Sequence, residues 1–174
     1  ADPSFSSLKS VLTTAFKRAA PASIDLYAEW SSDAKTKVIF TTTTRFGYNE
    51  DNGQYGIAYV LVEDGLTGTG SSWAQQNYYN GQSVGGEMSW WCSAGSPVTG
   101  LEFNHVAVAG WSVQNGITGS VNPVIDINTK QTHTYTGSIS GNSLVQDKTK
   151  LKAVALLIDR TNGTIVNAAQ TAIA

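Results

Sequence analysis

The hydrophobic positions of this chain change their period after the first twenty residues. Apolar side chains recur at helical spacing at Phe5, Leu8, Leu12, Phe16 and Ala19, which predicts an amphipathic helix. Its apolar stripe needs a partner surface, either on the domain that follows or on one that precedes it. We therefore divide the chain into residues 1–20, an N-terminal helix at a junction to an upstream domain, and residues 21–174.

From residue 23 onward the apolar positions alternate every second residue, which predicts strands. In residues 37–46, for example, Val38, Phe40 and Phe46 share one face with two threonines. Strands are expected at residues 23–30, 37–46, 55–62, 103–111 and 129–140, and as a hairpin within 150–173 that turns at Asn162-Gly163. The sequence therefore predicts a mainly β fold, an antiparallel β-sandwich of the jelly-roll or immunoglobulin-like kind with one N-terminal α-helix.

Two histidines lie within these predicted strands. His105 shares its strand face with apolar residues such as Phe103 and Trp111, so we expect a hydrogen-bonded core residue. His133 falls in the threonine-rich segment 129–140, which we expect to be an exposed strand. Residues 55–62 are apolar on both faces, as in a central strand.

Residues 67–100 form a long segment rich in Gly, Ser, Gln and Asn that nevertheless carries large aromatic residues. Long segments of this kind in a compact domain are usually functional or disordered, and the aromatic residues favour order. Flat rings beside amide groups can stack on a sugar or grip a peptide; alternatively, the rings fill the end of the sandwich. The candidate ligand-binding residues are Trp73, Gln76, Tyr78, Tyr79, Trp90 and Trp91, with Gln75 and Asn77 beside them.

Composition narrows the possible partners. The net charge is −2 and only 14% of residues are charged, so no basic surface is expected and nucleic acid is excluded as a partner. No apolar run reaches the ~20 residues that a membrane span requires. Cys92 is the single cysteine, which excludes a disulfide within the chain and a Cys-x-x-Cys site.

Adjacent carboxylates, Glu63 and Asp64, end the strand at 55–62. Successive strand residues point to opposite faces, so both cannot serve one centre while the strand continues. They form either a polar strand end that enters a turn or part of a hard-cation site.

No diagnostic catalytic or metal-binding spacing is present. His105 and His133 lack the separations of zinc ligands. Cys92 would need a basic partner, for which His105 is the candidate. We therefore expect no catalytic residue, no metal and no cofactor, and the chain is predicted not to be an enzyme.

Three stretches carry a resemblance to a known family: "VLVEDGLTG" with "QQNYY" close behind, "FNHVAVAG", and "LKAVALLIDRTNGTIVNAAQT". Together they resemble the C-terminal β-domain of the twenty-eight-kilodalton outer-membrane protein family of Bacteroides-type bacteria. The family's recurring positions correspond to Glu63, Asp64, Gln76, Tyr79, Asn104 and His105. The family strand often continues to an arginine after the histidine, whereas this chain has valine and alanine there.

The resemblance implies an exported β-sandwich module at the outer membrane or cell surface, with the periplasm as an alternative location. It also implies a longer, lipid-anchored precursor with an upstream thioredoxin-like domain. Within this pattern we expect Glu63 or Asp64 to accept hydrogen bonds from Gln76, Tyr79 or His105.

Three functions follow from this reading. The first is a non-catalytic binding or accessory module for a glycan or a peptide, possible partners at the cell surface. The second is a structural spacer or docking domain for the thioredoxin-like domain. The third, ranked last, is an enzyme that uses His105 with Cys92 or Glu63.

Overall fold

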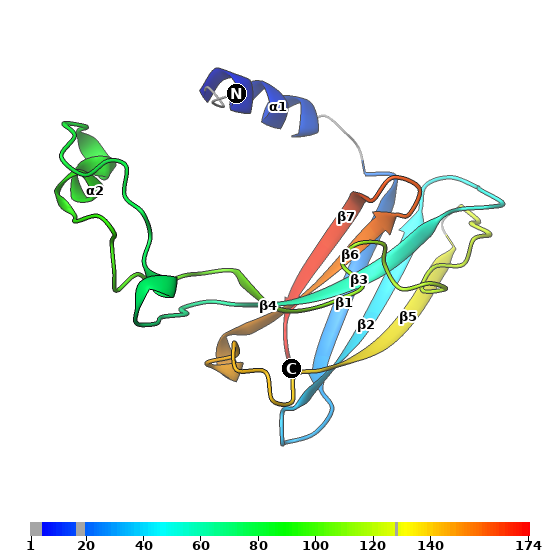
Figure 1. Cartoon of the computed structure of the whole chain (residues 1–174). Helices are drawn as coiled ribbons and strands as arrows, with labels where there is room; N and C mark the ends of the chain where they lie inside the picture. The colour runs from blue at the N-terminus through cyan, green and yellow to red at the C-terminus, as the bar shows by residue number, and fades with distance from the viewer. Residues whose placement is uncertain (1–4, 17–19, 128) are drawn as a thin grey trace.

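Two antiparallel sheets packed face to face make up the body of the protein (Figure 1). The computed structural model describes residues 5–16, 20–127 and 129–174. One sheet has the order β1-β2-β5, with β1 at Ala22–Trp30, β2 at Lys37–Phe46 and β5 at Lys130–Ser138. The other has the order β4-β3-β6-β7, with β3 at Tyr55–Glu63, β4 at Val106–Trp111, β6 at Leu151–Asp159 and β7 at Thr164–Ala172. The predicted mainly β sandwich is confirmed.

Helices are few and short. Helix α1 spans Phe5–Phe16 and α2 spans Ser89–Ser93, and single 3-10 turns occur at Ser71–Trp73 (η1), Gly86–Met88 (η2) and Lys148–Lys150 (η3). In the described part of the chain, no helix combines the length and apolar character that crossing a membrane requires.

The core forms because alternate residues of facing strands point inward. On β2, the inward positions from Val38 to Phe46 are all buried, and Phe40 packs on Tyr59 of β3 with ring centroids 4.7 Å apart. β3 lies between β4 and β6 and is buried on both faces over most of its length. The predicted central strand is therefore confirmed.

The two open sides of the sandwich are closed differently. Beside β7, Ala174 donates its backbone N–H to the Ala28 carbonyl of β1 at 2.9 Å. On the other side, the indole of Trp111 on β4 packs against Gly137 of β5. A Cβ atom at position 137 would come within 2.6 Å of the indole. Glycine is required at 137 because any side chain would displace this ring.

A polar cluster joins the sheets inside this core. The Tyr59 hydroxyl lies 2.9 Å from Thr42 Oγ1 and 2.9 Å from His133 Nδ1. Burial raises the pKa of Tyr59 to about 12 and lowers the pKa of His133. The expectation that His133 is exposed was wrong, because β5 exposes its threonine face while His133 and Tyr135 point toward the core, half-buried.

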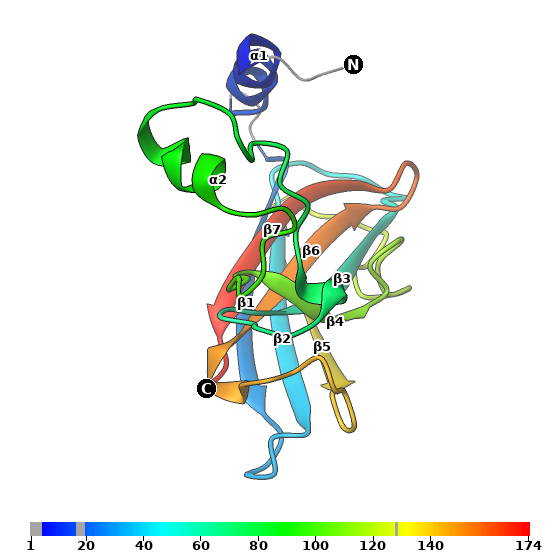
Figure 2. The ribbon, with the colours of Figure 1, turned by 60° about the vertical axis from the view of Figure 1, so that its left-hand side comes forward.

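Helix α1 is present as predicted, but it stands away from the sheets (Figure 2). Leu8, Val11 and Leu12 are 51%, 65% and 47% exposed. This part of the apolar stripe is therefore not buried on the sandwich. The side chains of Phe5 and Phe16, and Ala19 as a whole, lie outside the described residues. The division of the chain at residue 20 stays a prediction.

We predict that Tyr59→Phe lowers the free energy of unfolding by about 1–2 kcal/mol, because buried Thr42 and half-buried His133 lose a hydrogen-bond partner. Urea denaturation measures the loss. Tyr135→Phe is the matched control, since its ring stacks on Tyr59 at 5.4 Å. Equal losses in the two variants would show that the buried hydroxyl contributes nothing specific.

Acidification is expected to destabilise the protein through His133. Burial lowers the pKa of this imidazole in the folded state, below the ~6.5 of an unfolded histidine. Stability is therefore complete above about pH 6.5 and declines as the pH falls toward the lowered pKa, because the unfolded chain binds the proton first. Urea midpoints between about pH 7.5 and 5 should fall less steeply for His133→Gln. Parallel curves for the two proteins would exclude His133 as the cause.

Candidate functional site

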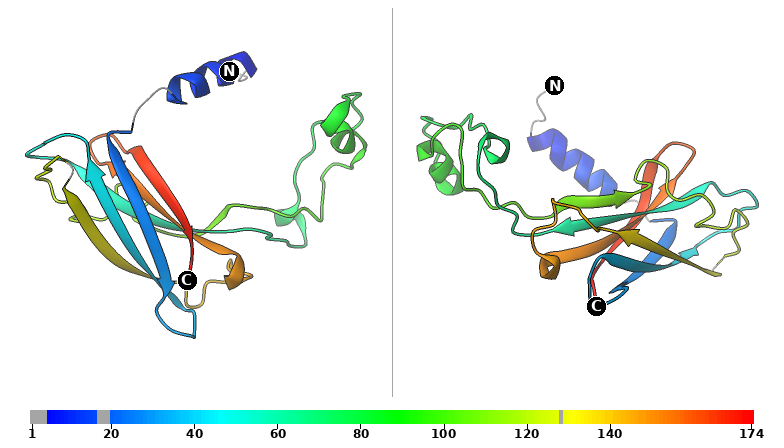
Figure 3. Two further views of the ribbon diagram at one scale, coloured as in Figure 1. Left: turned by 180° about the vertical axis from the view of Figure 1, so that it is seen from behind. Right: turned by 60° about the horizontal axis from the view of Figure 1, so that its bottom comes forward.

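Between β3 and β4 the chain leaves the sandwich as a long projection, which we call the arm (residues 67–102; Figures 1 and 3). Its base comprises residues 63–66 and 103–106, where the two chain segments meet the sheet. Its tip comprises residues 75–98, closed by a backbone pair between Gln75 and Val98 at 2.9 and 2.8 Å. The candidate residues of the aromatic segment lie on the arm, and those of the polar strand end lie in its base.

The two segments of the base are fastened to each other by backbone and side-chain bonds. Leu66 and Phe103 exchange backbone hydrogen bonds of 2.9 and 2.8 Å. The Gly65 N–H donates to Asn104 Oδ1 at 2.8 Å. The arm therefore starts and ends at neighbouring positions, and both of its ends are fixed.

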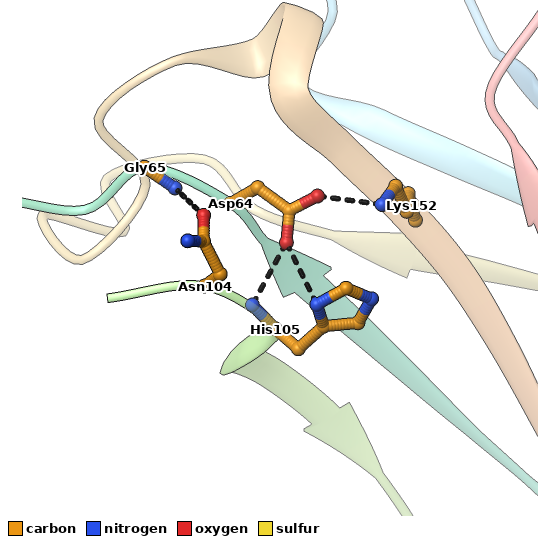
Figure 4. A network of polar contacts seen from close by, with 5 residues as sticks. All are labelled: Asp64, Gly65, Asn104, His105 and Lys152. Atoms are coloured by element: carbon orange, nitrogen blue, oxygen red, sulfur yellow. Dashed lines mark hydrogen bonds and ion pairs between the residues drawn. The ribbon is translucent and has the colours of Figure 1, made fainter. Parts of the chain in front are cut away.

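Asp64 completes this attachment from the outer face (Figure 4). Its Oδ1 accepts the backbone N–H of His105 at 2.8 Å and lies 3.1 Å from His105 Nδ1, and its Oδ2 lies 2.5 Å from Lys152 Nζ. The hydrogen bond from Lys152, followed by that from the His105 backbone, lowers the pKa of Asp64. Asp64 thus joins β3, the start of β4 and β6.

His105 does not occupy the core position expected for it. β4 begins one residue later, and His105 is exposed with a φ of 56°, in the left-handed region. That conformation is uncommon for a residue with a side chain. The two contacts with Asp64 hold it there. The prediction was wrong because the strand was extended backward through this residue.

Glu63 points to the opposite side from Asp64 and is buried. Its carboxylate accepts the backbone N–H groups of Gln146 at 3.1 Å and Asp147 at 2.5 Å. The side chain of Gln146 in turn bonds both backbone groups of Thr67 at the start of the arm, at 3.1 and 2.7 Å. Glu63 therefore fixes the connection between β5 and β6 and, through Gln146, the arm.

The partners expected for the carboxylate pair are divided between the base and the tip. His105 contacts Asp64, whereas Gln76 donates to Ser96 Oγ at 2.9 Å and the Tyr79 N–H donates to Asn77 at 3.0 Å. Among the described residues, no group of three or more His, Cys, Asp or Glu side chains is arranged to hold a metal ion. The pair's observed contacts are with protein groups.

Asn77 organises the tip from within. It is buried, and its Nδ2 donates to the carbonyls of Trp91 at 2.8 Å and Gly95 at 3.2 Å. Its Oδ1 accepts the Tyr79 N–H, and its own N–H donates to Ser96 Oγ at 3.2 Å. The hydrogen bonds of this one residue thus hold separate segments of the tip together. No pattern in the sequence indicates this role, because Asn77 lies among other amide side chains.

The structure separates the aromatic candidates into two groups. Trp73 is half-buried, covers Gly68 and packs on Phe103 of the base with ring centroids 5.9 Å apart. On the tip, Tyr78, Tyr79 and Trp90 are 81%, 45% and 55% exposed. Trp91 is half-buried and meets Trp90 edge-on at 4.9 Å. The alternative that the rings fill the end of the sandwich does not hold for the tip.

A concavity of about 390 Å³ lies beside α2 on the tip. Its lining includes Gln82, Ser83, Ser89, Cys92 and Ser93. The Cys92 thiol donates to the Val84 carbonyl at 3.6 Å. The five residues of α2 therefore include Trp90 and three residues that line the concavity, Ser89, Cys92 and Ser93.

Comparison with known proteins reveals a likeness of fold. No protein-family model matches the sequence, and no curated protein sequence matches it. HBP35 of Porphyromonas gingivalis is similar in structure, with a TM-score of 0.61 and 13% identity over 95% of this chain and 45% of that one. A domain of the outer membrane lipoprotein Omp28 from Porphyromonas gingivalis gives a TM-score of 0.41 and 13% identity over 90% of each chain. This chain thus spans less than half the length of HBP35.

We predict that Glu63→Ala lowers the free energy of unfolding by about 2–4 kcal/mol, because the N–H groups of Gln146 and Asp147 lose a charged acceptor. Glu102→Ala is the matched control, since Glu102 is exposed on the arm. Urea denaturation measures both. A Glu63→Ala protein as stable as the control would mean that the buried carboxylate does not support the fold.

Proposed function

We propose that this chain is a non-catalytic binding or accessory module of an exported, envelope-associated bacterial protein, and that the tip of the arm contacts the ligand. The observation that carries the proposal is the exposure of Tyr78 and Trp90 on an ordered projection. Exposed aromatic side chains offer large, rigid contact areas at small entropic cost. A glycan or a peptide is the ligand class that such rings suit.

The construction of the arm supports a binding role. Asn77 and the Gln75–Val98 pair fix the tip, and Asp64 and Leu66 fix the base. A site held in its binding conformation before the ligand arrives loses less entropy on binding. The arm therefore presents its rings ready for contact, away from the sandwich.

The envelope location rests on the motif resemblance to the twenty-eight-kilodalton outer-membrane protein family. On that basis we place the chain at the outer membrane or cell surface, within a longer lipid-anchored precursor. The fold shared with HBP35 is compatible with a module of a longer protein, because the match covers 45% of that chain.

The non-catalytic assignment rests on where the reactive groups lie. Cys92 is on the tip and donates to the Val84 carbonyl, whereas His105 is at the base and pairs with Asp64. The tip and the base lie at opposite ends of the arm (Figure 1). A thiolate nucleophile needs its base within hydrogen-bond reach, so this pair is poorly placed for catalysis.

A second candidate function is docking of an upstream thioredoxin-like domain through α1. The observation that favours it is the exposure of Leu8, Val11 and Leu12 on one helix. Exposed apolar side chains grouped on a helix are typical of a surface that packs against a partner. In this reading the sandwich acts as a spacer.

We predict that the double substitution Tyr78→Ala/Trp90→Ala abolishes retention of material from a Bacteroides-type cell-envelope extract on the immobilised chain, because it removes the two most exposed rings of the tip. Urea denaturation should show an unchanged sandwich. A variant that joins Ala74 to Thr99 by a short glycine turn removes the tip entirely and should behave in the same way.

Tyr27→Ala is the matched control, because Tyr27 is also an exposed aromatic residue, but on the outer face of β1. Retention that survives loss of the tip would contradict the proposal. If it is lost instead in Leu8→Ser/Leu12→Ser, the docking function replaces the binding function.

A further inference from the structure

The chemistry of the tip narrows the ligand class that the proposed function leaves open. Residues 67–102 contain no Lys, Arg or His, and their only charged residues are Glu87 and Glu102. A site without cationic side chains lacks the charge-assisted hydrogen bonds that most strongly select phosphate, sulfate or carboxylate groups. The tip is therefore suited to an uncharged ligand.

Three of the polar side chains that line the concavity donate a hydrogen within the tip. Ser89 donates its hydroxyl to the Gly86 carbonyl, and Ser93 donates to the Trp90 carbonyl at 3.0 Å. Gln82 donates its amide to the Tyr78 carbonyl at 3.0 Å. The hydroxyl and amide oxygens keep lone pairs as acceptors. These acceptors suit a ligand that supplies donors, as a polyhydroxylated molecule does.

Part of the tip backbone is hydrogen-bonded within the tip as well. Gly81 donates to the Cys92 carbonyl at 2.9 Å, Gln82 to Tyr79 at 3.0 Å and Ala94 to Trp90 at 2.9 Å. Peptides that bind by strand addition require a row of unpaired backbone groups on a sheet edge. The described elements of the tip are instead the short helical segments η2 and α2. This arrangement disfavours a peptide as ligand.

We infer that the tip binds a neutral, hydroxyl-rich carbohydrate. Trp90 and Tyr78 supply flat surfaces for the C–H faces of sugar rings, and the concavity beside α2 accepts hydrogen bonds from sugar hydroxyls. Its volume of about 390 Å³ lies within the usual range of small-molecule sites. This inference rests on the proposed binding role of the arm and names its ligand class.

Titration calorimetry with the full chain tests it directly, using mannan, dextran, xylan and a glucomannan as neutral probes. We expect at least one of them to bind, with little change at about 0.5 M salt. Trp90→Ala and Tyr78→Ala should each weaken that binding at least about tenfold. Trp90→Phe should retain part of it and Tyr27→Ala all of it. Hyaluronate and phosphatidylcholine vesicles serve as the anionic and lipid probes.

Treating the envelope extract separates failure of this inference from failure of the proposed function. Periodate destroys sugar rings that carry adjacent hydroxyls, whereas proteinase K destroys peptides. Arm-dependent retention that is lost after periodate and survives proteinase supports a carbohydrate. Retention lost only after proteinase, or Trp90-dependent binding to the vesicles, overturns the carbohydrate while keeping the arm as the binding element. No arm-dependent retention of any extract, and no binding of the four polysaccharides, overturns both.

Discussion

The alternation of side chains at the end of β3 determines how the arm and the β5–β6 connection are attached to the sandwich. Because neighbouring strand residues face opposite ways, Glu63 is directed inward to the β5–β6 connection and Asp64 outward to His105 and Lys152. The two adjacent acidic residues therefore stabilise different parts of the structure. Inserting one residue in β3 would exchange them, placing a carboxylate without its partners in the core and leaving the arm unattached.

The sandwich could be predicted from the sequence because its cause is local. In β2, for example, burial alternates with a period of two, and Val38, Phe40 and Phe46 mark the buried face in the sequence. Of the contacts that attach the arm, the one between Asp64 and His105 was expected from the family resemblance and is confirmed. The contacts with Lys152 and Gln146 could not be predicted, because they join residues far apart in the chain. Asp64 and Lys152 are separated by 88 positions, and Glu63 and Gln146 by 83. No periodicity links such residues, so only the fold reveals them.

The candidate site was predictable in composition but not in arrangement. The aromatic segment contains the right residues, yet nothing in it distinguishes Trp73, which packs on Phe103, from Trp90, which is exposed. The distinction arises from contacts within the fold, since Trp73 also covers Gly68 whereas Trp90 lies on the exposed tip. The environment of His133 escaped prediction for a similar reason, since it depends on Tyr59 in the facing sheet.

The adjacent ends of the arm have an evolutionary consequence. Because Leu66 and Phe103 are paired and both ends leave the sheet together, the segment between them can change in length or sequence without shifting the register of β3 against β4. Lengthening a closed loop costs little additional entropy. The same sandwich can therefore carry arms of different length and sequence. Conversely, this arm can be transferred to another sandwich in which two paired residues hold the ends of the loop together.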